Sequence, residues 1–412
     1  MLQKRHIIFF ILLLKMPDFV MAQQNNYNKD SLINAVLQSI NADSVRQTIQ
    51  TLQDFNTRFA LAPDHKNPAV FISNKLKALG YNDVKLDSFM LDSIQWPQGS
   101  GTFYNTWQYT VVAQSNGTID ASKIFILGAH YDDILNQGDA FTYAPGADDN
   151  ASGIAAMIET ARVFKLHNIQ PAYTIRFVAF AAEELYLNGS YKYTDKVFAA
   201  NDNIVLMINN DMVAHNLQPA NNWKFNIQKY PQTDWIENLT NQIAQDYTQL
   251  TPVVATNSIE HSDSYPFYLR GYPAVFFQEY DFCFLLHTIS DSINSLDMNY
   301  CAEVTKISCG ILLNTNLTST GTANIQKAEI NTDIYPNPVQ DNMNVSINSK
   351  LNQKVTISVF DMNNHQVFEN ERLLTQSGIN NFVYDLRSLS KGIYYCTIKT
   401  PQSVNCQKII KL

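Results

Sequence analysis

The chain has 412 residues, a length typical of two or three domains with room for a large core. Hydrophobic residues make up 45% and charged residues 16%, which excludes a disordered, collagen-like or coiled-coil chain. The net charge of -8 at pH 7 does not provide the basic surface of a nucleic-acid-binding protein, so we expect no nucleic-acid partner.

Residues 1–22 have the layout of a secretory signal peptide. Lys4 and Arg5 form a basic start, residues 7–14 are apolar, and Ala22 precedes a plausible cleavage point. A membrane span needs about 20 apolar residues, and this run is shorter. We therefore predict export without a stable membrane span; a buried N-terminal helix is the alternative.

Residues 23–315 combine amphipathic helices with continuous apolar strands. Such strands, separated by helices, are typical of a largely parallel sheet covered on both faces. The predicted fold is therefore α/β, with a mostly parallel mixed sheet and helices on both faces. The helices are predicted at 31–55, 66–80 and 152–166, and the strands at 123–127, 174–180, 204–208 and 273–277.

The residue composition and the periodicity of the sequence change near residue 316. Residues 316–330 are polar and aperiodic, which predicts a linker. Residues 331–412 carry short strand patterns separated by Asn, Gly and Ser turns, which predicts a small all-β sandwich.

Acidic residues and histidines follow the apolar strands of the α/β part. His130 ends the first strand, and Asp132 lies two residues on, close enough in sequence to accept the second imidazole N–H. Ligands of open α/β sheets bind beyond the carboxyl ends of the strands. A turn histidine with a capping Asp is the alternative explanation of this pair.

Three further stretches place acidic residues in the same position. Asp148 precedes a helix and has two oxygens with which to bridge two metals, although it also suits a helix cap. Glu183 and Glu184 follow a buried strand, where one carboxylate can ligate a metal while the other accepts a proton. Asp211 ends the third strand.

His287 completes the set after the fourth strand. The five candidate ligands are then His130, Asp148, Glu184, Asp211 and His287. Oxygen and nitrogen ligands without cysteine suit a hydrolytic zinc pair that leaves room for water.

Residues 120–300 resemble the zinc-dependent exopeptidase family of secreted bacterial aminopeptidases, which are leucyl aminopeptidase-like and related to glutaminyl cyclases and glutamate carboxypeptidases. The matching stretches occur in the family's order: GAHYDD, APGADDNASG, AAEE, NNDM and HTISD. The resemblance implies a phosphorylase/hydrolase-like zinc peptidase fold.

The resemblance also implies a site with two zinc ions bridged by Asp148 and a cis peptide between Asp148 and Asp149. One zinc would be completed by His130 and Asp211, the other by Glu184 and His287. Glu183 would be the general base for a metal-activated water, and Asp132 the partner that orients His130.

The implied substrates are peptides or proteins with a free N-terminus. An apolar pocket would take the first side chain, and the candidates for its wall are Met212, Tyr280, Phe282 and Leu286, which could equally be ordinary core residues. Many relatives carry His where this chain has Ser264, so a contact from that position to the substrate would be absent.

Residues 331–412 resemble the C-terminal sorting domain of type IX secretion. The matching stretches are IYPNP from residue 334, VFD from residue 359, LSKGIYY from residue 389 and the basic end KIIKL. The resemblance implies the type IX secretion machinery as a partner and a secreted or cell-surface location, reached through the periplasm of a Gram-negative bacterium. A small carbohydrate-binding or adhesion sandwich is the alternative.

The main hypothesis is a secreted di-zinc aminopeptidase that hydrolyses the N-terminal peptide bond. One alternative is a glutaminyl cyclase-like acyltransferase acting on N-terminal Gln peptides. The other is a non-catalytic adhesion protein on the same fold.

Overall fold

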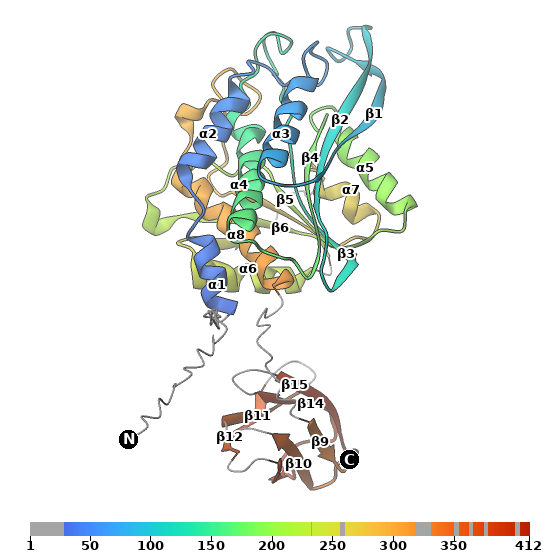
Figure 1. Ribbon diagram of the computed structural model, residues 1–412, viewed down its shortest axis with the longest axis vertical. Helices are drawn as coiled ribbons and strands as arrows, with labels where there is room; N and C mark the ends of the chain where they lie inside the picture. The colour runs from blue at the N-terminus through green and yellow to red at the C-terminus, as the bar shows by residue number, and fades with distance from the viewer. Residues whose placement is uncertain are drawn as a thin grey trace, which may run out of the picture. The chain divides into compact units, whose positions relative to one another are not determined.

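The computed structural model describes residues 29–231, 233–255, 260–317, 331–349, 354–361, 366–374, 378–399 and 404–412. These residues form two compact units, residues 29–317 and residues 331–412 (Figure 1). The predicted signal peptide at 1–22 lies outside the described residues.

The larger unit is built on an eight-stranded sheet in the order β1-β2-β4-β3-β5-β8-β6-β7. The central strands β4, β3, β5 and β8 are parallel, whereas β1, β2 and β6 each pair antiparallel with a neighbour. The strands are β1 Asp83–Gln95, β2 Phe103–Ser115, β3 Asp120–His130, β4 Tyr173–Phe180, β5 Asn203–Asn210, β6 Lys224–Lys229, β7 Thr251–Val254 and β8 Ala274–Glu279.

Helices cover both faces of this sheet (Figure 1). α2, α4 and α8 pack together on one face with α1 and α6, and α5 and α7 pack on the other. The helices are α1 Lys29–Leu37, α2 Ala42–Gln53, α3 Lys66–Ala78, α4 Gly153–Leu166, α5 Asn188–Ala199, α6 Asp234–Tyr247, α7 Ser264–Leu269 and α8 Met298–Asn316. The predicted α/β fold with a mixed sheet is confirmed.

Alternation along the central strands explains why both faces are apolar. In β3, Phe125 and Leu127 belong to the core under the α2–α4–α8 layer, whereas Ile124 and Ile126 belong to the core under α5 and α7. Successive side chains of a strand point to opposite faces. A strand buried on both faces therefore reads as a continuous apolar run.

One predicted helix is two helices in the structure. The predicted helix at 31–55 is interrupted between α1 and α2, where Asn41 has an extended backbone. The Asn41 side chain accepts hydrogen bonds from the backbone N–H groups of Asp43 and Ser44. Such an N-cap starts a new helix at Ala42, so the apolar periodicity continues across a break in the backbone.

The smaller unit has a three-stranded sheet, β13-β10-β9, and a four-stranded sheet, β12-β11-β14-β15, both antiparallel. Side chains of both sheets share one buried core, among them Val345, Ile357 and Tyr384, which confirms the predicted all-β sandwich. The strands are β9 Asn331–Tyr335, β10 Asn342–Ser349, β11 Lys354–Phe360, β12 Gln366–Leu373, β13 Gly378–Asp385, β14 Gly392–Lys399 and β15 Val404–Lys411. Among the described residues of both units, no helix combines the length and apolarity of a membrane span.

Candidate active site

The loops that follow β3, β4, β5 and β8 bring together the side chains of one buried cluster. His130 is the last residue of β3, Asp211 directly follows β5, and His287 lies in the loop after β8. Glu183 and Glu184 follow β4. The carboxyl ends of the parallel strands meet at one edge of the sheet, and this edge is where open α/β sheets bind ligands.

Asp149 lies between the two histidines of the cluster. Its Oδ1 is 3.2 Å from His130 Nε2, and its Oδ2 is 3.1 Å from His287 Nε2. Asp211 Oδ1 lies 3.4 Å from His130 Nε2, and Glu184 Oε2 lies 2.9 Å from His287 Nε2. The result is two groups of three possible metal ligands that share Asp149.

Asp148, the predicted bridging residue, does not occupy this position. Its Oδ1 accepts a hydrogen bond from the backbone N–H of Ala214 at 3.1 Å, so its carboxylate belongs to an adjacent buried network. The prediction is therefore corrected to Asp149. The cis peptide likewise lies between Asp149 and Asn150, not between Asp148 and Asp149.

The turn that carries Asp149 is held from two sides. The backbone N–H groups of Asp148 and Asp149 donate to the two oxygens of Asp291, at 2.8 and 3.1 Å. These bonds fix the backbone of both residues, and the carboxylate of Asp149 is left to face the histidines. Asp291 had no assigned role in the sequence analysis, although it lies in the HTISD stretch that includes His287.

Arg58 fixes the start of the same turn from the protein interior. It is fully buried, forms a salt bridge with Asp133 at 3.1 Å, and donates to the carbonyl oxygens of Pro145 and Gly146 at 2.9 and 2.7 Å. Gly146 has a φ of 46°, and a Cβ there would lie 2.6 Å from Arg58 Nη2. The glycine is therefore required by both its backbone conformation and the close approach of Arg58.

Asp132 connects the β3 and β4 loops. Its two carboxylate oxygens accept from the backbone N–H groups of Glu183 and Glu184 at 3.0 and 3.2 Å. Its Oδ1 lies 3.7 Å from His130 Nδ1, and its carbonyl oxygen lies 3.2 Å from the same nitrogen. Asp132 therefore lies beside His130, as predicted, and also positions the glutamate pair.

Glu183 is brought to the cluster beside His130. Its Oε2 lies 3.9 Å from His130 Nε2, and its side chain lines the cavity above the cluster. Burial, opposed by the charge of His130, raises the pKa of Glu183 well above its ordinary value in the metal-free protein. The Glu183 side chain is therefore placed between the cluster and the cavity, where a proton could be passed to or from a bound molecule.

Ser262 is a site residue that the sequence analysis did not identify. Its hydroxyl donates to Asp211 Oδ2 at 2.6 Å and accepts from the side-chain amide of Asn209. Ser262 therefore orients the carboxylate of Asp211 toward His130. Ser264, where many relatives carry His, is buried, and its hydroxyl is 2.9 Å from that of Tyr230.

The carboxylates of the cluster outnumber its imidazoles, and burial and hydrogen bonding shift the pKa values of both kinds of group. Burial lowers the pKa of His287, but its bonds and charge interactions with Asp149 and Glu184 raise it overall to about 11. Burial raises the pKa of Glu184 to about 8. Burial also acts to raise the pKa of Asp149, but its bonds to His130 and His287 hold it well below its ordinary value.

These residues fit a divalent metal ion such as zinc. The cluster offers two imidazole nitrogens and several carboxylate oxygens, the donor set of hydrolytic zinc sites. Glu184 Oε1 is buried and has no hydrogen-bond partner among the described residues. A cation at this place would satisfy that oxygen and replace the protons that keep the carboxylates together.

A cavity of about 970 Å³ opens above the cluster. All four predicted pocket residues line it: Met212, Tyr280, Phe282 and Leu286. Tyr186, Tyr191, Phe276 and Phe284 extend the aromatic part of the wall. Contact between these residues and a substrate remains a prediction.

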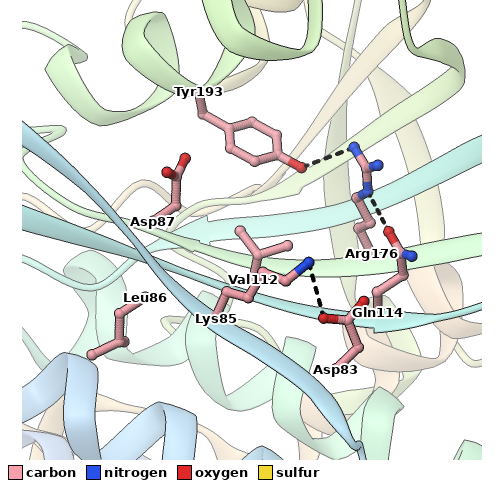
Figure 2. Close-up of a pocket in the computed structure, with 8 residues that line it drawn as sticks. All are labelled: Asp83, Lys85, Leu86, Asp87, Val112, Gln114, Arg176 and Tyr193. Atoms are coloured by element: carbon pink, nitrogen blue, oxygen red, sulfur yellow. Dashed lines mark hydrogen bonds and ion pairs between the residues drawn. The ribbon is translucent and has the colours of Figure 1, made fainter. Parts of the chain in front are cut away.

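A second cavity, of about 350 Å³, lies between β1, β2, β4 and α5 (Figure 2). Arg176 projects into it and bonds to the side chains of Gln114 and Tyr193. Its Nη1 also lies 2.5 Å from Asp202 Oδ2. Because the polar groups here are matched with one another, we assign no ligand to this cavity.

Two family models match the chain, one in each unit. Residues 110–312 match the model described as Peptidase family M28, and residues 333–412 match the model described as Secretion system C-terminal sorting domain. The two resemblances drawn from the sequence motifs are thereby confirmed.

Known proteins match the larger unit across most of their length. A probable leucine aminopeptidase of Trichophyton verrucosum is 27% identical over 302 residues, which cover 70% of this chain and 76% of that protein. Among solved structures, a zinc aminopeptidase from Bacillus subtilis has a TM-score of 0.57 at 17% identity, covering 68% of this chain and 97% of that one. A glutaminyl cyclase of Bacteroides thetaiotaomicron has a TM-score of 0.53 at 20% identity, covering 67% and 98%.

The family model and the relatives indicate that the larger unit is a metallopeptidase, a hydrolase of the aminopeptidase type. Residues 110–312 of the chain match peptidase family M28, and residues 333–412 match a secretion sorting domain.

Proposed function

We propose that this protein is a secreted di-zinc aminopeptidase that removes the N-terminal residue of peptides, with Glu183 as general base. The observation that carries the proposal is the position of Asp149 between His130 and His287, with one further carboxylate beside each histidine. This arrangement provides two adjacent metal positions that share one carboxylate.

In this proposal, His130 and Asp211 would hold one zinc ion, Glu184 and His287 would hold the other, and Asp149 would be available to both. Zinc in such a site supplies Lewis-acid chemistry, because it lowers the pKa of water and polarises a carbonyl group. Ser262 and Asp132 keep Asp211 and His130 in the orientation that ligation requires.

Glu183 performs the proton transfers. It accepts a proton from the attacking water at a carboxylate oxygen and later donates it to the amine that leaves. The hydrogen bond from the Glu183 backbone N–H to Asp132 fixes the backbone position of Glu183. From this position its side chain lies beside His130 and lines the cavity. Glu184, one residue on, faces His287 instead, so the two glutamates have separate roles.

The cavity favours a peptide with a free N-terminus. Glu183, Glu184 and Asp211 line it, and their carboxylate oxygens can accept hydrogen bonds from a free amino group. The predicted wall residues Met212, Tyr280, Phe282 and Leu286 surround the space for the first side chain. Hydrolysis, rather than cyclisation, is favoured because both sets of metal ligands are complete.

Export is the remaining part of the proposal. Residues 1–22 act as a signal peptide that takes the chain into the periplasm of a Gram-negative bacterium. The sorting domain then directs it through the type IX machinery to the cell surface or the medium.

The test uses purified protein, with zinc, on a leucine-led peptide in free and N-acetylated forms. We expect release of leucine from the free form only, and loss of that release with a chelator. Cleavage of the acetylated form would contradict an aminopeptidase. Loss of ammonia from an N-terminal Gln peptide without release of an amino acid would instead establish a glutaminyl cyclase.

A further inference from the structure

The wall of the large cavity that β6 and β8 provide carries three polar side chains and one aromatic side chain. The two strands run antiparallel, and their register places Asn226 opposite Gln278 and Gln228 opposite Phe276. Alternate residues of a strand face the same side, so these four side chains share one face of the sheet. All four line the cavity above the ligand cluster.

Gln228 has an unmet hydrogen-bonding requirement at this wall. Its residue is 3% exposed, and its Nε2 donates to Gln278 Oε1 at 2.9 Å. Its Oε1 is buried and finds no hydrogen-bond partner in the part of the chain that the structure describes. Buried acceptors in proteins are normally paired, so this atom is the place where a ligand can supply what the protein does not.

The described residues around Gln228 limit the unpaired buried hydrogen-bond acceptor on this wall to Gln228 Oε1. Asn226 already donates its side-chain amide to the carbonyl oxygen of Glu279 at 2.8 Å. Met212, Phe276 and Phe282 provide apolar surface in the same cavity. An apolar side chain that fills the cavity therefore leaves Gln228 Oε1 without a partner, whereas a side chain ending in an N–H group can satisfy it.

We propose that Gln228 is a specificity-determining residue, and that the cavity prefers an N-terminal side chain ending in an uncharged amide over an apolar one of the same size. This inference rests on the proposed function, because it takes the cavity as the site of the first side chain. An amide suits the wall because its N–H donates to Gln228 and its oxygen can accept from the Gln278 amide. A charged ammonium would lose its hydration against the apolar part of the wall.

The test measures binding, so that it does not depend on turnover. Free glutamine and methionine, which have similar length, and asparagine and leucine, which have similar shape, are titrated calorimetrically into zinc-loaded full-length protein. Wild type is compared with Gln228→Leu. The control is Gln114→Leu, which removes a glutamine from the second cavity.

We expect at least one amide side chain to bind more tightly than its apolar counterpart in the wild type. That preference should fall about tenfold in Gln228→Leu, as for one lost hydrogen bond, and should be unchanged in Gln114→Leu. Equal preferences in wild type and Gln228→Leu, or no binding of either amide amino acid to wild type, would overturn the inference. Failure of the proposed function would appear separately, as absence of leucine release.

Discussion

The two cavities of the larger unit differ in how their charges are balanced. In the second cavity, Lys85 lies 3.1 Å from Asp83 (Figure 2). Arg176, which also lines this cavity, is paired with Asp202. In the large cavity, the imidazoles of His130 and His287 face the carboxylates of Asp149, Glu183, Glu184 and Asp211, and Glu260 and His261 also line the cavity. Buried carboxylates in excess require protons or a cation. Both regions contain a cavity, so the presence of a cavity does not identify the candidate active site. The excess of buried carboxylates in the large cavity does.

The largest expected effect is a difference in bound zinc and activity between variants of the adjacent residues Asp148 and Asp149. Asp149→Asn should reduce bound zinc to less than one ion per chain and activity to background, because both metal positions share this carboxylate. Asp148→Asn should retain more zinc, since Asp148 contacts Ala214 and not the histidines. Metal analysis and steady-state assays on both variants measure the difference. The reverse ranking would restore Asp148 as the bridging residue.

Next in size is the loss of the general base. Glu183→Gln should lower kcat by about 10³-fold, within the range of general acid–base catalysis, while zinc stays bound. Glu184→Gln is the matched control, because it removes an adjacent carboxylate that faces His287 and should reduce zinc content as well. Activity close to wild type in Glu183→Gln would exclude this residue as the base.

Acidic pH should weaken zinc binding. The pKa of His287 is raised to about 11, so the metal-free protein holds this proton throughout the neutral range. Its stabilising effect on the metal-free fold is fully present below the ordinary His pKa of about 6.5 and is lost as pH rises through about 11. Zinc must displace this proton in order to bind. For each proton displaced, the affinity for zinc falls about tenfold with every unit by which the pH decreases.

Glu184 adds to the same trend, since its pKa is raised to about 8. Between pH 8 and pH 6 we expect the zinc dissociation constant to increase by about 100-fold or more. Competition with a chelator of known affinity measures it at each pH. A dissociation constant that does not change with pH would show that the cluster carries no such protons.

The smallest effect is expected in the second cavity. Arg176→Gln breaks the largely buried pair with Asp202 and should lower the free energy of unfolding by about 1–2 kcal/mol. Activity should stay at the wild-type value, because this cavity shares no lining residue with the large cavity. Urea denaturation and the leucine-release assay on the same preparation check both statements. A large loss of activity without loss of stability would give this cavity a function.

Local patterns were sufficient for the central strands of the larger unit. Continuous apolar runs predicted strands that became β3, β4, β5 and β8, because a strand buried on both faces has no polar side to interrupt the run. The break between α1 and α2 was not predicted, since the cap at Asn41 leaves the apolar periodicity intact. The polar wall of β6 and β8 was also missed, because it depends on pairing between strands far apart in the chain.

The sequence by itself determined the two kinds of unit, the order of the ligand stretches and the chemistry of their residues. These properties are local: a strand end, a histidine and a pair of glutamates can be recognised within a few residues. Only the tertiary structure decided between Asp148 and Asp149, because adjacent carboxylates have no distinguishing spacing. Their directions are set by Ala214 and Asp291, which approach from distant parts of the chain. The position of Gln228 beside the site was decided in the same way, by the register of β6 against β8.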